Sequence, residues 1–223
     1  ASIATLVDDA RLVDEITNKV RGIAAAAGFE AVDSIKALYE AISSGQEPAK
    51  ALKIVETSAQ LAKAGIADLA PTADLLTNVL NAYGISADKA GLVSDALFKT
   101  VEKGKTTIPE LASSLGKILP VAAQANIDLT QLGGALAGLT IGGLSTAEAV
   151  TGLRSLFNNI IKPSSQAATL AKELGINFST SAIQAKGFTG FIGDLKAKLD
   201  DLRKGGADTS NIIATLAGDP KAI

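Results

Sequence analysis

The sequence predicts an all-α protein, a multi-helix bundle of short helices and helical hairpins that glycine and proline residues separate. Apolar residues recur every three or four positions along most of the chain, as in Ile16, Val20 and Ile23, which is the spacing of one helix face. Runs of alternating polar and apolar residues, which would indicate strands, do not compete with this pattern. Helix-ending residues punctuate it at regular intervals, namely Gly28, Gly45, Gly65, Gly84, Gly104, Gly143, Pro163, Gly175 and Gly205.

The periodic segments give the expected helix boundaries. We expect helices at residues 3–27, 30–43, 47–64, 69–83, 87–103, 108–125, 129–141, 146–161, 164–174, 188–204 and 209–217. Pro120 lies inside one of them, and because its ring removes a hydrogen bond and clashes one turn back, we expect a kink or a break around residues 117–119. Residues 176–186 are expected to be the least regular part.

Two helix starts carry their own capping chemistry. Thr107 with Glu110, and Ser145 with Glu148, each place a hydroxyl three residues before a glutamate. In such a pair each side chain can bind the free backbone amide of the other residue. The short connections before these starts favour antiparallel or steeply crossing helices.

The composition argues against an enzyme. The 223 residues include no His, Cys, Met or Trp, and these types supply most general bases, soft metal ligands and reactive nucleophiles. We therefore predict no catalytic residue, no cofactor and no metal site. With 4% aromatic residues, small side chains are expected to pack the helices closely. The absence of an initiating Met leads us to expect a fragment of a longer chain.

Two apparent site motifs have simpler structural interpretations. Residues 104–106 (Gly-Lys-Thr) match the end of a phosphate-binding loop, but Lys99 stands where that motif needs its first glycine, and a helix precedes it instead of a strand. The acidic pairs at residues 8–9 and 200–201 point about 100° apart on a helix, so neither pair presents two carboxylates to one atom. We interpret Gly104 as a helix terminator and the acidic pairs as solvated surface.

Neither nucleic acid nor a membrane is an expected partner. The net charge is −2 and no basic block occurs, and the aromatic residues are not interleaved with Lys or Arg, so we expect no specific nucleic acid binding. The longest uncharged window, residues 129–147, includes five glycines and several hydroxyl side chains. It is a poor bilayer span, and we favour a buried helical hairpin over membrane insertion.

A stripe of glycines marks the helix expected at residues 129–141. Gly134, Gly138 and Gly142 recur every four residues and align along one helix side, where another backbone can approach closely. Each glycine inside a helix costs about 1 kcal/mol relative to alanine. The stripe therefore indicates close helix packing, a broken helix, or a segment that changes conformation. Close helix packing is the first of these hypotheses.

Residues 85–98 align with residues 144–157, at an offset of 59. Both segments end in phenylalanine, and we interpret Phe98 and Phe157 as equivalent core residues of two helical hairpins. Two copies do not make a repeat array, and chance similarity between amphipathic helices is an equal alternative. Phe188 and Phe191 flank Gly190 at a helix entry, which they are expected to fix in place.

A series of short motifs keeps its order and spacing between residues 84 and 163. It comprises a Gly-Ile-Ser turn, a Gly-Lys-Thr-Thr segment before a Glu-Leu-Ala helix, a proline followed by two alanines, a Leu-Thr-x-x-Gly step, and a Leu-Arg helix that ends in Lys-Pro-Ser. These are residues 84–86, 104–107, 110–112, 120–123, 139–143, 153–154 and 162–164. The series resembles the core region of phage tail tape measure proteins. One departure is Asn126, where the family commonly has glycine, and Asn also tolerates a left-handed cap.

The resemblance implies three sections. They are N-terminal helices at residues 1–65, a tape measure core region at 66–176, and partly irregular C-terminal helices at 177–223, all in a fragment that can also form one domain. The implied role is structural, in tail length determination, tail assembly and DNA ejection, without catalytic residues. The implied partners are the tail tube protein, tail assembly chaperones and other copies of the chain. The implied location is the interior of the virion tail, and the host cytoplasm during assembly.

Two alternatives stay open at this point. Other parts of tape measure proteins can act on membranes or peptidoglycan, so the chain could be a membrane-active or cell-wall-directed module. It could also be a helical adaptor unrelated to phages. Liposome leakage would favour the first alternative, whereas genes for tail tube and tail chaperone beside the coding sequence would exclude the second.

Overall fold

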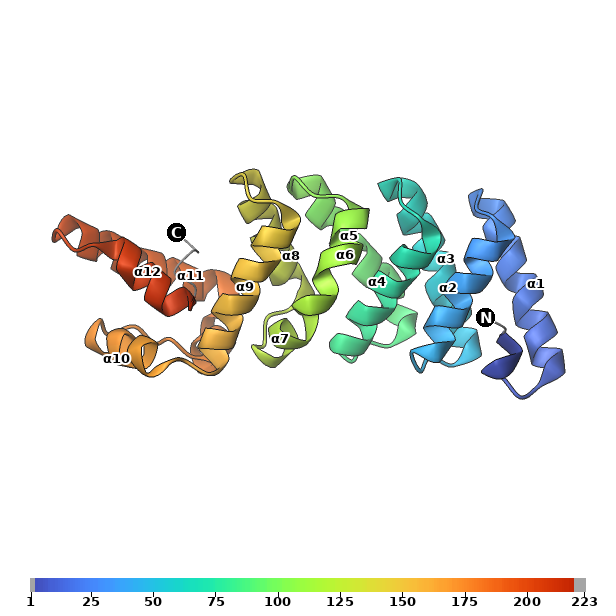
Figure 1. Ribbon diagram of the computed structural model, residues 1–223, viewed down its shortest axis with the longest axis horizontal. Helices are drawn as coiled ribbons and strands as arrows, with labels where there is room; N and C mark the ends of the chain where they lie inside the picture. Colours follow the sequence, from blue (N-terminus) through green and yellow to red (C-terminus); the bar gives the residue numbers. More distant parts are fainter. Residues whose placement is uncertain (1–2, 219–223) are drawn as a thin grey trace.

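The computed structural model describes residues 3–218, and every regular element within them is a helix. This confirms the predicted all-α fold class and the helical hairpins. The hairpins stand side by side in an elongated row that runs from the N-terminal to the C-terminal end of the molecule (Figure 1). Residues 1–2 and 219–223, which belong to the first and third expected sections, lie outside the described residues.

The row has two layers of helices. One layer holds the first helix of each hairpin, and its members contact each other in sequence: α1 (Ala10–Ala27), α3 (Pro48–Gly65), α5 (Ala90–Lys103) and α8 (Leu129–Ile141). The other layer holds the returning helices, which also contact their neighbours along the row: α2 (Ala31–Ser43), α4 (Leu69–Ala82), α6 (Ile108–Ser114) with α7 (Leu119–Gln124), and α9 (Thr146–Ile161). Such a stack is a helical solenoid.

Three further helices close the C-terminal end. They are α10 (Ser165–Glu173), α11 (Thr180–Lys204) and α12 (Thr209–Ala217), and α12 contacts α9, α10 and α11. The ring of Phe157 on α9 meets Phe188 on α11 edge to face, with the centroids 5.4 Å apart. Phe188 in turn stacks on Phe191 at 6.4 Å. The contact between Phe157 and Phe188 therefore docks α11 against the end of the row.

The structural repeat differs from the repeat suggested by sequence. The first helices of the hairpins begin at Ala10, Pro48, Ala90 and Leu129, which gives spacings of 38, 42 and 39 residues. The offset of 59 aligns α5 with α9, and these helices belong to different layers. The interpretation of Phe98 as a core residue was accordingly wrong, because its side chain is 41% exposed whereas Phe157 is fully buried.

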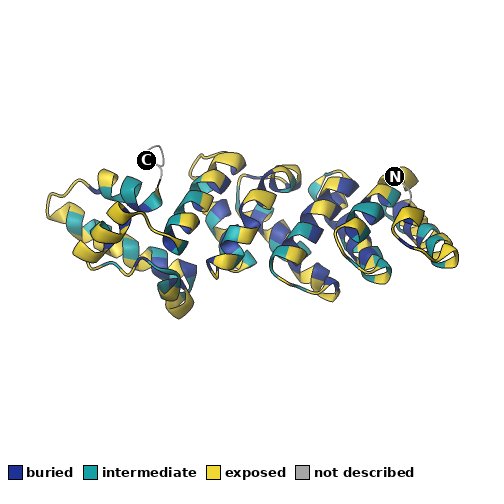
Figure 2. Ribbon diagram, turned by 60° about the horizontal axis from the view of Figure 1, so that its bottom comes forward, coloured by how far each residue is buried: buried dark blue, intermediate teal, exposed yellow. Residues whose placement is uncertain are grey.

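The core lies between the layers and continues from one hairpin to the next (Figure 2). One cluster of buried apolar residues spans α1, α2, α3 and the start of α4, and a second runs from α3 to α12. Helices α3 and α4 contribute to both clusters, with Val55 in the first and Ile54 in the second. Burial of each of these leucine or isoleucine side chains stabilises the folded chain by about 1.5–3 kcal/mol. The division into three sections at residues 65 and 176 stays a prediction.

Most predicted helix boundaries agree with the structure, and the differences have local causes. The first helix begins at Ala10 because Asp9 caps it, accepting hydrogen bonds from the amides of Arg11 and Leu12 at 2.9 and 3.3 Å. Of the kink or break predicted before Pro120, the structure shows a break, since α6 ends at Ser114, a 3-10 turn η3 (Leu115–Lys117) follows, and α7 starts at Leu119.

Residues 176–186 are more regular than predicted. Residues 180–186 form the first part of α11, and Ser179 caps it by accepting a hydrogen bond from the amide of Ala182. Gly187, with φ at 70°, then interrupts the helix. The second part begins at residue 188, as expected. Short 3-10 turns also precede two helices, η1 (Ile3–Thr5) before α1 and η2 (Ala87–Lys89) before α5.

The turn between α3 and α4 places its glycine and its left-handed residue at different positions. A Cβ on Gly65 would collide with Cγ1 of Ile108, the first residue of α6. Gly65 is therefore needed for the close packing of α3 against α6. The left-handed cap of α3 is the next residue, Ile66, with φ at 51° and 92% of its surface exposed. A β-branched residue in this backbone region is strained.

This arrangement predicts opposite effects at adjacent positions. Ile66→Gly should raise the free energy of unfolding by about 1 kcal/mol because it relieves the left-handed strain. Gly65→Ala should lower it by about 1–3 kcal/mol because buried Ile108 has no room to retreat. Urea unfolding of the purified chain measures both changes.

Gly91→Ala on α5 serves as the control, because open space surrounds a Cβ there, and it should stabilise the helix by about 0.5–1 kcal/mol. Equal effects of Gly65→Ala and Gly91→Ala would contradict the packing role of Gly65.

Candidate functional site

A dense set of polar contacts joins two turns at one edge of the row. The first is the α5–α6 turn, and the second is the α8–α9 turn beside it (Figure 1). We call residues 104–110 and 140–148 the turn junction. It contains the Gly-Lys-Thr-Thr segment that carries part of the family resemblance, so the structure gives that segment a physical role.

Gly104 brings the end of α5 against α8. It caps α5 with an extended backbone, at φ −119° and ψ 176°, which confirms the predicted helix terminator. A Cβ at Gly104 would lie 2.9 Å from the Cα of Ala137 and 2.9 Å from Oγ1 of Thr140. Glycine is therefore required by close backbone approach, and not by a phosphate group.

Threonine hydroxyls connect the two turns. The Lys105 amide donates to Oγ1 of Thr140 at 3.1 Å, and the Thr140 hydroxyl donates to the Leu136 carbonyl at 2.9 Å. The Thr146 hydroxyl donates to Oγ1 of Thr106 at 2.7 Å. Thr106, Thr140 and Thr146 are all buried. These bonds replace water for groups that packing has enclosed.

Both predicted capping boxes are confirmed, and one of them also serves the junction. Oε2 of Glu110 accepts from the Thr107 amide at 2.9 Å and lies 3.2 Å from Oγ1 of Thr146. Oε2 of Glu148 accepts from the Ser145 amide at 2.9 Å. The carboxylate of Glu110 therefore fixes the start of its own helix α6 and reaches the first residue of helix α9.

The close packing predicted at Gly134, Gly138 and Gly142 is not found within the described chain. No neighbouring atom lies within 4 Å of a Cβ built on Gly134 or Gly138, and Gly142 meets only carbonyl groups of its own helix. The close contact is made instead by Gly133, where an added Cβ would collide with Oγ1 of Thr100 on α5. The four-residue spacing placed the three glycines on one face, but α8 buries the opposite face.

Each neighbouring pair of hairpins has its own polar contact. Gln46 donates to Asn81 at 2.7 Å, and Lys53 pairs with Asp88 at 3.0 Å. The Tyr83 hydroxyl donates to the carbonyl of Ile127 at 3.0 Å, and burial raises its pKa well above the ordinary value. The backbone of Asn126, beside this contact, is left-handed with φ at 59°, as the sequence predicted. Polar contacts therefore fix the register of successive hairpins.

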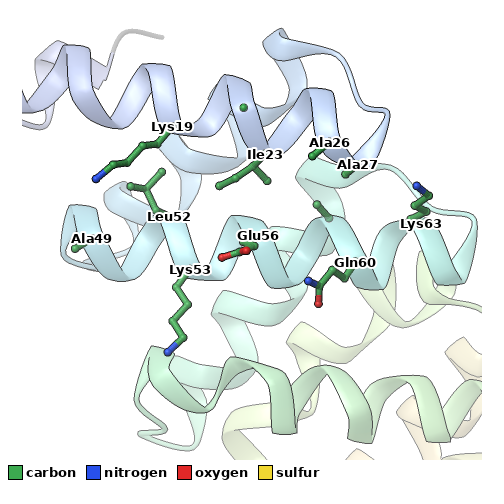
Figure 3. Close-up of a pocket in the computed structure, with 12 residues that line it drawn as sticks. Lys19, Ile23, Ala26, Ala27, Ala49, Leu52, Lys53, Glu56, Gln60 and Lys63 are labelled. Carbon is green, nitrogen blue, oxygen red and sulfur yellow. The ribbon is translucent and has the colours of Figure 1, made fainter.

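Several surface grooves lie between helices. One, of about 780 Å³, lies between α1 and α3, where Ile23 and Leu52 point towards each other and Lys19 lies on the rim (Figure 3). Another, of about 530 Å³, lies along α8, α9 and α11 and is lined in part by Gly134 and Gly138. Within residues 3–218, no cluster of three acidic side chains could hold a metal ion, and no helix is long and apolar enough to cross a bilayer.

Sequence reasoning identified the capping residues but missed the junction contacts. Thr106, Thr140 and Thr146 each bond to a residue at least 35 positions away, and such distances leave no local signal. The available hint was a threonine directly beside each capping box.

The contact between Thr106 and Thr146 predicts that substitutions of these two residues have non-additive effects on the free energy of unfolding. Thr146→Val should lower the free energy of unfolding by about 1–3 kcal/mol, because it leaves the buried hydroxyl of Thr106 without its partner and removes one of the contacts of the Glu110 carboxylate. Thr106→Val should act in the same direction. The double variant should cost less than the sum of the single variants, since it leaves fewer buried groups unpaired. Urea unfolding of all four proteins gives this coupling.

Thr151→Val, at an exposed position of α9, provides the reference for loss of a threonine hydroxyl that bonds only within its own helix. Strict additivity of the two junction substitutions would contradict a direct contact.

Two carboxylates predict how stability depends on pH. A hydrogen bond from Lys53, together with its charge, lowers the pKa of Asp88 from its ordinary 3.8. Hydrogen bonds from Ser145 lower the pKa of Glu148 from 4.5. Because both pKa values are lower in the folded chain, the stabilisation is present above the ordinary values and is lost as the pH falls through the folded ones. The urea midpoint should therefore decrease in this acidic range.

Asp88→Asn and Glu148→Gln should reduce this acid dependence. Asp95→Asn, which removes an equal charge at an exposed position of α5, is the matched control. An unchanged acid profile in the Asp88 and Glu148 variants would contradict the assignment.

Comparisons with known proteins agree with the motif series. A family model described as phage-related minor tail protein matches residues 17–218. The chain is 30% identical over 135 residues to a probable tape measure protein of Clostridium phage phiCD119, covering 58% of this chain and 14% of the relative. It is 22% identical over 156 residues to the tape measure protein of Pneumococcus phage Dp-1, covering 70% and 14%.

A third relative is a probable tape measure protein of Escherichia phage P2, 24% identical over 147 residues that cover 66% of this chain and 18% of the relative. The chain therefore spans less than a fifth of the length of these relatives. No solved structure matches it significantly. Since the family model covers the row of hairpins from within α1 to the end of α12, the chain belongs to the family of phage-related minor tail proteins that includes the tape measure proteins.

Proposed function

We propose that the chain is a structural segment of a longer tape measure protein that takes part in tail length determination, tail assembly and DNA ejection. The observation that carries this proposal is the family match over residues 17–218, together with three relatives that are named tape measure proteins. Membership of this family excludes the alternative that the chain is a helical adaptor unrelated to phages.

The architecture supports a structural role. Buried side chains and turn contacts are devoted to joining one hairpin to the next, as at the turn junction and at the Lys53–Asp88 pair. The polar groups of the junction are satisfied by one another and by backbone atoms. They serve as mechanical connections and do not converge on a site for a reacting molecule.

The proposed location is the interior of the virion tail, with the host cytoplasm as the place of assembly. The proposed partners are the tail tube protein, the tail assembly chaperones and other copies of the chain. The exposed outer faces of the two layers are the surfaces available to them (Figure 2).

The location predicts protection from protease. A site-specific protease sequence inserted into the exposed turn at residues 205–208 of the full-length protein should resist cleavage in intact particles. It should become cleavable after the particles have released their DNA. Gel electrophoresis of the particle proteins measures both states.

The same sequence inserted in a tail protein on the outer surface is the control and should be cut in both states. Equal cleavage of the 205–208 insertion before and after DNA release would overturn the proposed location. Dye release from liposomes by the purified chain would instead favour the membrane-active alternative.

A further inference from the structure

We propose that the groove beside α8 receives a further helix of the longer protein, which packs next to α8 in the layer that holds α1, α3, α5 and α8. We call it the α8 groove, and it is the groove of about 530 Å³ along α8, α9 and α11. The occupant is a segment that follows residue 223 in the full-length protein, and its docked face is aliphatic and uncharged. This inference rests on the proposed function, which includes a longer protein.

The composition of α8 is that of a covered helix. Its 13 residues include no charged side chain, whereas α1, α3 and α5 in the same layer all carry charged residues at exposed positions. A helix without charges on any side is typical of a buried helix. Yet Thr130, Gly134, Gly138 and Ile141 are exposed, with 58% of the Ile141 surface open. One side of α8 therefore lacks both solvating charges and a cover.

Two glycines on this side of α8 have no packing role within the described chain. No neighbouring atom lies within 4 Å of a Cβ built on Gly134 or Gly138. Each glycine nevertheless makes a helix less stable than alanine would. On the opposite side, Gly133 receives Thr100 of α5 at close range. The open glycines allow the backbone of another helix to approach α8 in the same way.

The α8 groove has apolar walls that define the chemistry of its occupant. Leu153 and Leu156 of α9 lie on one side, and Phe188 and Ile192 of α11 on another. None of the residues that line the groove is charged. An amphipathic helix can place its aliphatic side chains in such a groove, whereas an acidic or basic side chain there would lose its hydration without gaining a partner. The docked face is therefore aliphatic and uncharged.

The α8 groove lies where the layer would continue. Helix α3 contacts α1 and α5, and α5 contacts α3 and α8, so each inner helix of this layer has a neighbour on both sides. Helix α8 packs on α5 through Gly133, and the α8 groove lies on its side towards α11. There α11 approaches α8 at Gly187, where an added Cβ would lie 2.9 Å from Nε2 of Gln131. A helix in the groove would extend an interface that the row already uses.

The full-length protein can supply this helix. The chain spans less than a fifth of the length of its relatives. The end of α12 lies against α9, where the Ser155 hydroxyl donates to the Ala217 carbonyl and the Asn159 amide donates to the Leu216 carbonyl, both at 3.0 Å. Helix α9 also supplies one wall of the α8 groove. A helix that follows residue 223 therefore needs only a short connection to reach it.

A tethered helix fits the α8 groove better than a second copy of the chain. Stable interfaces between separate proteins bury about 1,200–2,000 Å² in total, which is more than the contact along a single helix of 13 residues provides. A segment of the same polypeptide acts at an effective concentration of about millimolar. It can therefore occupy a small groove that would hold a separate molecule only weakly.

The test places one thiol at the edge of the α8 groove. The 223 residues contain no cysteine, and Thr130→Cys introduces one at an exposed lining position without adding bulk. The variant is prepared in the 223-residue chain and in the full-length protein, purified without other tail proteins. Mass spectrometry of the peptide that contains position 130 gives the rate of maleimide labelling. The rate should be about tenfold lower in the full-length protein, because labelling then requires local opening.

Two further variants show that the docked helix causes this protection. Gly138→Leu, combined with Thr130→Cys, should restore fast labelling in the full-length protein, because its side chain occupies the space of the approaching helix. Gly91→Cys, at an exposed and open position of α5, is the control and should be labelled at equal rates in both proteins. Equal rates at position 130 in both proteins would overturn the proposal.

A photoreactive group attached to the thiol at position 130 identifies the occupant. The expected crosslink joins α8 to a peptide that follows residue 223 of the same molecule, and protection should not depend on protein concentration. A crosslink to a second copy, or protection that is lost on dilution, would overturn the proposed occupant. These outcomes leave the proposed function intact. Absence of the full-length protein from particles would instead overturn the proposed function, while the labelling result would still hold.

Discussion

Burial between adjacent hairpins is the interaction on which the rest of the structure depends. The terminal helix α1 buries a narrow stripe of Ile16, Val20 and Ala24, whereas the inner helix α4 buries most of its residues, and one hairpin cannot cover so much apolar surface by itself. Stacking covers them, because every helix contacts its partner in the hairpin and its neighbour in the layer. The core is consequently continuous along the row, and stability is shared between each unit and its interfaces.

This dependence explains why small residues stand at the closest contacts. Gly65 receives Ile108, Gly104 receives the backbone of α8, and Gly133 receives Thr100. At each point a side chain or backbone from another hairpin occupies the space of a missing Cβ. The turn after α3 shows a cost of this packing. The glycine stands at position 65, where it contacts Ile108, so the left-handed position falls on Ile66, a residue that is strained there.

Polar contacts then set the register that apolar packing leaves open. Apolar surfaces attract without direction, whereas a hydrogen bond requires specific atoms at specific positions. The Thr106–Thr146 contact, the Tyr83 contact with Ile127 and the Lys53–Asp88 pair each join different hairpins. A chain built in this way can be extended or shortened by whole hairpins, which suits a protein whose proposed role concerns length.

The sequence by itself determined the elements that depend on neighbouring residues. Helix spacing, the capping boxes at Thr107 and Ser145, the break before Pro120 and the left-handed Asn126 were all predictable. Their causes act within about one helical turn, so the sequence pattern contains them in full.

Only the tertiary structure decided which face of each helix is buried and which residues meet across hairpins. The spacing of Gly134, Gly138 and Gly142 defined a face of α8, but contact with Thr100 selected the opposite face through Gly133. The repeat of about 40 residues and the exposure of Phe98 were likewise decided by the two layers. The physical reason is that these outcomes depend on contacts between residues tens of positions apart, which local periodicity does not contain.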